Sequence, residues 1–251
     1  MSEFSNFSPR EVELINSAIM PLIIGWTPFV PLHSQNLHVG YEQFAVFQSM
    51  LSILKPAVSL EIGTFQGQMF SLIAQHSKLA ISVDPDPSVK QKIQPFHQNA
   101  EFITATSDDA LPGLIQRIQA GTDPLEFVFL DGNHSKDFVR RDINNLLQYR
   151  PKTRTVILMH DSFNADCRSG MLAADWQSCR HCHFVDLDFS CGVVHPNPGI
   201  KGQLWGGLGF ALLLPETRKE DLTIRQTHAL TFAAANKPPA VPWWKQLFSR
   251  G

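Results

Sequence analysis

Acidic and histidine side chains follow two apolar segments of the sequence, at the point where each segment ends. Asp131 closes the run "EFVFLD" and His134 comes three residues later, while "TVILMH" ends at His160, directly before Asp161. Carboxylate oxygens that converge are the ligands that hard divalent cations prefer, with water and substrate oxygens completing the shell. Histidine titrates near neutral pH, so His134 can also take a proton from a hydroxyl. We therefore predict a catalytic site with Asp131 and His134 as its candidate catalytic residues.

The sequence leaves the presence and the kind of metal ion open. Asp131, Asp161 and His160 are the candidate ligands, and an imidazole in the set favours a softer ion such as Mn²⁺ or Fe²⁺ over Mg²⁺. A site without a metal is the other alternative. His134 is then either the general base or a histidine that only orders its loop.

The elements that have to position these residues are strands that alternate with helices. Two helical stripes of apolar residues lie at 111–118 and 139–147. The pattern predicts a three-layer, doubly wound, Rossmann-like α/β sandwich with a mostly parallel sheet, whose strand ends share one ligand-binding edge. The five β-rich runs are "AVSLEI", "LAISVD", "EFITA", "EFVFLD" and "TVILMH".

A glycine-containing turn, "SLEIGTFQGQ", follows the first expected strand. Gly63 and Gly67 bracket it, which lets the backbone bend and approach a ligand. A dinucleotide loop needs a further glycine where this turn has Phe65, so a pyrophosphate is disfavoured. Asp84 lies 23 residues after Glu61, close to the spacing of about 20 for a carboxylate that binds ribose hydroxyls. The turn therefore predicts an adenosine-type ligand without a diphosphate.

The segment "LEIGTFQG" resembles the first motif of class I S-adenosylmethionine-dependent methyltransferases, in particular the catechol and caffeoyl-CoA O-methyltransferase branch, whose turn also carries a large residue. The resemblance extends over roughly residues 57–214 and implies a seven-stranded sheet with an antiparallel last strand. It also implies that the turn passes the methionine part of the cofactor, that Asp84 holds the ribose, and that Ser107 and Asp108 flank the adenine. Without a ligand, Asp108 would be a helix N-cap. The candidate cofactor contacts are Glu61, Gly63, Thr64, Phe65, Gly67, Asp84, Ser107 and Asp108.

The sequence departs from that family at two positions of the reacting end. The family holds Mg²⁺ through two aspartates and an asparagine, and a lysine three residues after the first aspartate acts as base. Asp131 and Asp161 match the aspartates, but Ser162 stands at the asparagine position and His134 at the lysine position. The resemblance thus implies O-methylation of a small molecule with S-adenosylmethionine and, where a metal takes part, Mg²⁺ or Mn²⁺.

Composition narrows the class of partner. The chain of 251 residues has a net charge of −2, and its dispersed Lys and Arg residues argue against nucleic acid. No apolar run reaches the roughly 20 residues of a membrane helix, and the N-terminal sequence lacks a signal peptide. We expect a cytoplasmic protein without an integral membrane segment, which acts on a small-molecule acceptor; a homo-oligomer stays open.

The organisation that we expect is one structural domain in three parts. Residues 1–56 form a helical extension that begins near Ser8, residues 57–214 the catalytic domain, and residues 215–251 an extension with an amphipathic tail around Trp243 and Trp244. Two further strands, "HFVDLDF" and "LGFALLL", should be joined by a long loop, "SCGVVHPNPGIKGQLWGG".

Two alternatives to a methyltransferase and one further site stay open. An NAD(P)-dependent oxidoreductase shares the fold class, and a non-catalytic adenosine-binding or interaction protein could retain it. Cys179 and Cys182, near Cys167, Cys191 and two histidines, form a weak zinc signal that we interpret as reduced cysteines. The acceptor could carry a sugar or polyketide-like hydroxyl, a phenol or a carboxylate.

Overall fold

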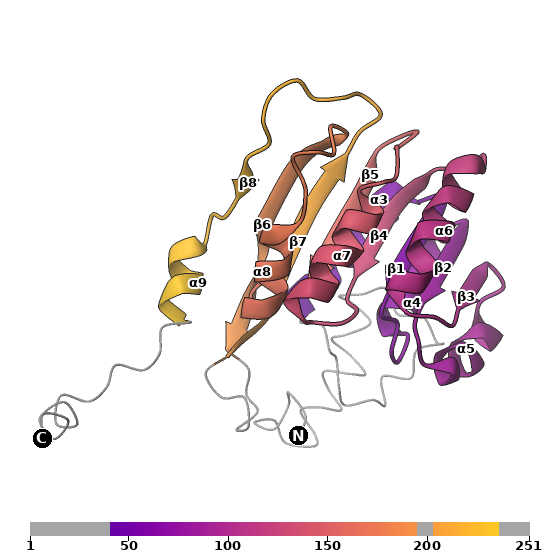
Figure 1. The fold of residues 1–251 in the computed structure, drawn as a ribbon. Helices are drawn as coiled ribbons and strands as arrows, with labels where there is room; N and C mark the ends of the chain where they lie inside the picture. Colours follow the sequence, from indigo (N-terminus) through magenta and orange to yellow (C-terminus); the bar gives the residue numbers. More distant parts are fainter. Residues whose placement is uncertain (1–40, 195–202, 236–251) are drawn as a thin grey trace, which may run out of the picture.

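The computed structural model describes residues 41–194 and 203–235, which fold around a single eight-stranded sheet (Figure 1). The expected first helix near Ser8 and the tail with Trp243 and Trp244 lie outside these residues. The strands are β1 (Val58–Ile62), β2 (Leu79–Val83), β3 (Ala100–Ile103), β4 (Leu125–Leu130), β5 (Thr155–His160), β6 (Cys182–Val194), β7 (Leu204–Leu213) and β8 (Ile224–Arg225). The helices are α3 (Tyr41–Leu54), α4 (Gln68–His76), α5 (Pro87–Ile93), the 3₁₀ turn η2 (Gln94–Phe96), α6 (Ser107–Ala120), α7 (Lys136–Leu146), α8 (Ala165–Ala173) and α9 (Ala229–Ala235).

The strand order confirms the predicted doubly wound fold. It runs β3-β2-β1-β4-β5-β7-β6-β8, with β1 to β5 parallel and β7 antiparallel to both of its neighbours. The expected number of seven strands was too low by one, because the two-residue β8 adds to the outer edge of β6. A short segment of this kind covers backbone groups that an edge strand would otherwise leave unpaired.

The prediction of a long loop between the last two strands was wrong at both of its ends. β6 continues to Val194 and β7 begins at Leu204, and the two strands pair as far as that point. Glycines in the segment suggested a loop, but Gly192 lies inside β6. A glycine is needed there because a Cβ at this position would lie 2.4 Å from Phe163 Cβ. A glycine in a strand can mark a close approach of two chain segments rather than the end of the strand.

Helices cover both faces of the sheet, which makes the three layers visible in Figure 1. The residues of β4 alternate: Phe127 and Phe129 pack with the apolar residues of α3 and α4, while Val128 and Leu130 pack with those of α6 and α7. This alternation is the period-two pattern of a strand that is buried on both faces. The two predicted helical stripes are buried on the second of these faces: Leu111, Leu114, Ile115, Ile118, Val139, Ile143, Leu146 and Leu147.

Helix α3 is part of the core, although it precedes the first strand. Its Phe47 is fully buried and packs edge-on against Phe129, with the ring centroids 4.6 Å apart. Phe44 and Leu51 extend the same apolar stripe. This packing fixes the position of the whole helix against the middle of the sheet.

Among the described residues, no helix has the apolar length that a membrane crossing requires.

Candidate functional site

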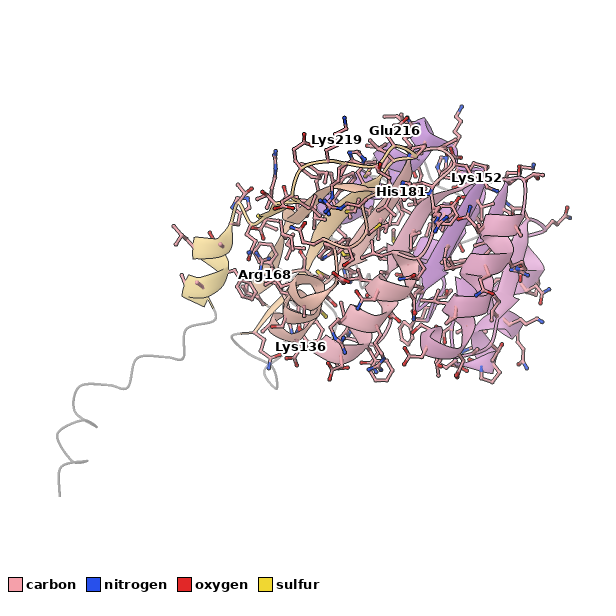
Figure 2. The ribbon with its side chains drawn as sticks, turned by 45° about the horizontal axis from the view of Figure 1, so that its top comes forward. Lys136, Lys152, Arg168, His181, Glu216 and Lys219 are labelled. Atoms are coloured by element: carbon pink, nitrogen blue, oxygen red, sulfur yellow. The ribbon has the colours of Figure 1, made fainter. Side chains whose placement is uncertain are left out.

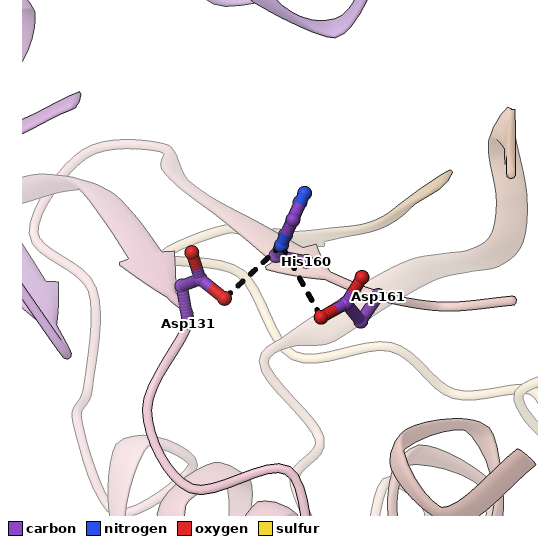
Figure 3. A group of neighbouring side chains, drawn as sticks. All are labelled: Asp131, His160 and Asp161. Atoms are coloured by element: carbon purple, nitrogen blue, oxygen red, sulfur yellow. Dashed lines mark hydrogen bonds and ion pairs between the residues drawn. The ribbon is translucent and has the colours of Figure 1, made fainter. Parts of the chain in front are cut away.

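The carboxyl ends of β4 and β5 bring two aspartates and a histidine together (Figure 3). His160 Nδ1 lies 3.0 Å from Asp131 Oδ1 and 3.5 Å from Asp161 Oδ2. One ligand atom from each of the three residues lies within 4.8 Å of the others. These are the residues that the sequence marked as candidate metal ligands, and their convergence follows from the pairing of two adjacent parallel strands.

His134 lies between this buried cluster and the solvent. Its Nε2 is 3.3 Å from Asp131 Oδ1 and 3.2 Å from Asp161 Oδ2. The side chain of His134 is 43% exposed, whereas that of Asp161 is 4% exposed. His134 is therefore the member of the group that an entering molecule meets first.

The charges of the four residues are strongly coupled. Burial opposes the ionisation of Asp131, but His160 and His134 outweigh it and lower the pKa of Asp131 to about 2. Burial would lower the pKa of His160, yet the two carboxylates raise it well above its ordinary value. A hydrogen bond to Asp131 raises the pKa of His134. The carboxylates thus favour the protonated form of both imidazoles, and a cation bound through His160 would have to displace the proton from a ring nitrogen.

Asp161 has an unusual backbone conformation that its side chain helps to hold. Its φ is 56°, in the left-handed region that non-glycine residues rarely adopt. Asp161 Oδ1 accepts a hydrogen bond of 2.6 Å from the Gly206 amide, and Gly206 itself has a φ of 70°. Strained residues held in this way cluster at functional sites.

Gln43 is a member of the site that the sequence analysis missed. It lies in α3, is 2% exposed, and its Oε1 is 3.0 Å from His160 Nε2. The only signal in the sequence is a polar residue directly beside the apolar positions of an otherwise core-facing helix.

The turn after β1 is held by the aspartate at the end of β2. Asp84 Oδ2 accepts hydrogen bonds of 2.9 Å from the amides of both Thr64 and Phe65. These are the N–H groups that a phosphate would need, so a negative charge already occupies that place. Phe65, which is 61% exposed with a φ of 48°, is therefore only part of the reason why the turn does not suit a pyrophosphate.

Gly63 allows the turn to contact the reacting end of the site. Its φ is 83°, and a Cβ at this position would lie 2.2 Å from the carbonyl oxygen of Asp131. Gly67 also has a positive φ, of 77°, and faces the side chain of Ile93. Both glycines are required by the backbone: Gly63 brings the β1 turn against the β4 tip, and Gly67 brings it against α5.

Glu61 is a buried carboxyl group at the end of β1. It is 1% exposed, and its Oε2 has no hydrogen-bond partner among the described residues. Burial, together with the nearby Asp131 and Asp84, raises the pKa of Glu61 well above its ordinary value, although Thr64 opposes the shift. Glu61 is thus able to remain protonated and to donate a hydrogen bond.

The two residues expected near the adenine begin α6. Ser107 is the first residue of the helix, and the Asp108 carboxylate accepts from Arg141 Nε at 3.0 Å. The alternative that Asp108 caps the helix is wrong, because Thr106 holds that position and accepts a hydrogen bond from the Asp109 amide. The N-cap side chain needs an extended backbone, which a residue inside the first turn does not have.

A cavity of about 520 Å³ opens beside His134. Trp205 stands edge-on to the His134 ring, with the centroids 5.6 Å apart. The lining is mostly polar, and it consists of Gly132, Asn133, His134, Ser135, Asn164, Asp166, Gln203 and Trp205.

The cysteines do not assemble into a metal site. Among the described residues, the group of converging metal-type ligands is the one at Asp131, and it contains no cysteine. Cys179 and Cys182 are buried free thiols, the first just before β6 and the second at its first residue, and burial raises the pKa of Cys182 to about 12. The neighbouring His181 and His183 contact the backbone oxygens of Leu214 and Glu216 instead.

Comparison with known proteins gives a partial family match. Residues 60–162 match a family model described as a methyltransferase domain, whereas no curated protein matches the sequence. The match covers β1 to the end of β5, which includes the turn and the strand tips described above. It confirms the resemblance to class I methyltransferases that the turn indicated.

Solved structures share the fold at low sequence identity. A cofactor-bound structure of Rv0187 from MTB is 16% identical, with a TM-score of 0.55 over 81% of this chain and 97% of that one. The O-methyltransferase from Bacillus cereus, in complex with SAH, is 14% identical, with a TM-score of 0.53 over 82% and 89%. The O-methyltransferase TomG from Streptomyces achromogenes, in complex with SAM, is 15% identical, with a TM-score of 0.54 over 86% and 100%.

Proposed function

We propose that this chain, which carries a class I methyltransferase domain, transfers the methyl group of S-adenosylmethionine to a hydroxyl oxygen of a polar small molecule. One observation carries the proposal. His134, with carboxylates of Asp131 and Asp161 within 3.3 Å of its Nε2, stands at the mouth of a polar cavity on the same sheet edge as the β1 turn. A base beside a ligand turn is what methyl transfer to oxygen requires.

The charge around the turn supports a cationic cofactor. The carboxylates of Asp84 and Asp131 lie near it, and Asp84 binds the turn amides. A sulfonium cofactor gains from acidic surroundings, whereas the pyrophosphate of NAD(P) is repelled by them. We therefore prefer S-adenosylmethionine to NAD(P), with Asp84 on the ribose, Ser107 and Asp108 near the adenine, and Gly63, Thr64, Phe65 and Gly67 along the methionine part.

The protein's own residues need to do little covalent chemistry. The sulfonium supplies an already activated methyl group, so the enzyme aligns the acceptor oxygen with it and removes a proton. His134 donates its Nε2 hydrogen to the carboxylates of Asp131 and Asp161, so the other ring nitrogen, Nδ1, accepts the proton of the acceptor. The two carboxylates then stabilise the positive charge on the ring. Polar side chains in the cavity, such as Asn133 and Gln203, orient the acceptor.

A divalent cation fits the cluster at Asp131, His160 and Asp161. Metal bonds of about 2.0–2.2 Å place neighbouring ligand atoms roughly 3 Å apart. His160 Nδ1 lies 3.0 and 3.5 Å from the two carboxylates, and one ligand atom from each residue lies within 4.8 Å of the others. Two carboxylates with an imidazole favour Mn²⁺ over Mg²⁺. When bound, such an ion would lower the pKa of the acceptor hydroxyl.

Binding calorimetry tests the cofactor. The wild type should bind S-adenosylmethionine and S-adenosylhomocysteine but not NAD⁺, and Asp84→Ala should weaken both sulfur ligands at least about tenfold, because it removes a charged partner. Asp86→Ala is the matched control: this exposed N-cap of α5 lies two residues away and bonds to Ser88. Equal binding of NAD⁺, or an Asp84→Ala variant with unchanged affinity, would refute the assignment.

Turnover separates an enzyme from a binding protein with the same fold. We expect release of S-adenosylhomocysteine when the protein is screened against polar hydroxyl compounds, and stimulation by Mn²⁺. Activity that chelator leaves unchanged would remove the metal from the mechanism while leaving the transferase intact. Tight cofactor binding without turnover on any hydroxyl compound would favour the non-catalytic alternative.

A further inference from the structure

Gln43 stands out among the buried polar residues because it reaches the site from a helix that precedes the matched domain. The family match begins at residue 60, whereas Gln43 lies in α3 and contacts His160 across 117 positions of sequence. Its side chain is 2% exposed. A glutamine that is this deeply buried needs partners for its amide, and the His160 ring supplies one.

We infer that Gln43 is a positioning residue that directs Nδ1 of His160 toward the cation site between Asp131 and Asp161. The inference rests on the metal site proposed above and adds a residue to it. An amide oxygen only accepts hydrogen bonds, so the contact of 3.0 Å between Gln43 Oε1 and His160 Nε2 requires the proton to be on Nε2. Nδ1 then presents its lone pair to a cation once its own proton has been displaced.

This arrangement is the usual support of a metal-bound histidine. Such a histidine almost always donates its other ring N–H to an oxygen, which fixes both the tautomer and the orientation of the ring. Here the oxygen belongs to Gln43, and His160 Nδ1 faces both carboxylates at 3.0 and 3.5 Å. The two nitrogens of one ring thus have two separate functions.

The surroundings of Gln43 leave it little freedom. Phe47, one turn later in α3, packs against Phe129, and Phe129 is in turn edge-on to the His160 ring at 6.0 Å. On the other side, a Cβ on Gly206 would come within 3.0 Å of Gln43 Nε2. Gly206 also donates its amide to Asp161 Oδ1, so the same glycine abuts Gln43 and orders a second ligand of the site.

The inference extends the catalytic unit toward the N-terminus. A domain that began at residue 57 would contain His160 without the group that orients it. We therefore place α3 within the catalytic unit.

Mn²⁺ binding to the full-length chain tests the role of Gln43. Gln43→Met removes the acceptor at nearly constant volume and should weaken Mn²⁺ binding about 10- to 100-fold. Gln43→Glu keeps an acceptor and should restore most of the affinity. Gln48→Met is the matched control, because Gln48 lies in the same helix but contacts Ser52 and His76. S-adenosylhomocysteine affinity should be unchanged in all three variants, which shows that each is folded.

The outcomes separate this inference from the proposed function. A wild type that binds no Mn²⁺ would refute the metal site, whereas a Gln43→Met variant that binds Mn²⁺ as tightly as the wild type would refute the role of Gln43 alone. NMR of nitrogen-labelled histidine adds a readout that needs no ion. The wild type should show a slowly exchanging proton on His160 Nε2, and this proton should exchange faster in Gln43→Met. An unprotonated Nε2 in the wild type would overturn the inference.

Discussion

At the scale of single residues, His134 links the buried acidic cluster to the cavity that we assign to the acceptor. Only its unprotonated form can act as a base, and its hydrogen bond to Asp131 raises its pKa above the ordinary 6.5. His134 is therefore a stronger base than an ordinary histidine, but it is protonated and inactive up to a higher pH.

The pH dependence of methyl transfer should therefore follow His134. We expect the rate to rise with pH, with a midpoint above 6.5, because the active fraction grows as the ring loses its proton. His134→Gln should lower kcat by about 10²-fold or more and remove this acidic limb. His183 contacts the Glu216 backbone oxygen at the far end of β6 and provides the control: His183→Gln should leave kcat and the acidic limb unchanged. A His134→Gln variant with the pH profile of the wild type would rule out His134 as the base.

A second residue-scale prediction concerns stability. Asp142 in α7 is 1% exposed, and burial raises its pKa from 3.8 to about 6, opposed by Ser107. The folded state therefore holds this proton more tightly than the unfolded state, so stability decreases as pH rises from about 4 to 6 and remains low above that range.

Removal of this charge should stabilise the protein at neutral and alkaline pH. Asp142→Asn should raise the free energy of unfolding by up to about 3 kcal/mol at pH 8 and give no such gain at pH 4. Urea denaturation at the two pH values measures the difference. Asp137→Asn, an exposed position in the same helix, serves as control, and an equal gain at both pH values would contradict the explanation.

At the scale of elements, the β1 turn joins the side of the site that we propose for the cofactor to the side that we propose for the reaction. Gly63→Ala would place a Cβ 2.2 Å from the Asp131 carbonyl oxygen at a φ of 83°. We expect it to cost at least about 2 kcal/mol of stability and to weaken binding of both S-adenosylhomocysteine and Mn²⁺, because the two strand tips have to separate.

Gly113→Ala provides the opposite case in the same fold. Gly113 lies inside α6 and has nothing within 4 Å of its Cβ position. Alanine should therefore stabilise the helix by up to about 1 kcal/mol. Denaturant unfolding should show that Gly63→Ala lowers the free energy of unfolding and Gly113→Ala raises it. Changes of the same sign would show that the contacts around each glycine do not decide the effect.

At the scale of the whole molecule, a buried ion pair of Arg168, which Figure 2 labels beside α8, helps to hold the segment that follows β7. Arg168 of α8 donates to Asp188 of β6 at 2.7 Å, to the Ser162 carbonyl oxygen at 3.2 Å and to Gln226 at 3.1 Å. Asp188 also accepts from the His228 amide. Residues 162, 188 and 226 thus meet at a single guanidinium group, and His228 joins them through Asp188.

Loss of this pair should be costly because it leaves a buried carboxylate unpaired. We expect Arg168→Met to lower the free energy of unfolding by about 3–5 kcal/mol. Lys78→Met, which removes the exposed pair with Asp123, should change it by less than about 1 kcal/mol. Equal effects in thermal unfolding would show that Arg168 does not hold the segment.

The sequence by itself determined the fold class and the edge on which the site lies. Local periodicities of two and 3.6 residues mark strands and helices, and alternation of the two leads to a parallel sheet whose strand ends share an edge. Asp131, His160 and Asp161 could therefore be assigned to one edge before any coordinates were known. The first motif identified the domain in the same way, because its residues are contiguous in the chain.

Only the tertiary structure decided how these residues are partnered. The contact of Gln43 with His160, the Asp84 carboxylate on the turn amides and the pairing of Gly206 with Asp161 join residues 117, 20 and 45 positions apart. No local pattern encodes such contacts, because each depends on where a separate element packs and which way its side chain then points. The sequence determined at which edge of the sheet chemistry could take place. Packing between residues far apart in the chain determined how the side chains of the site are oriented and which of their atoms carry protons.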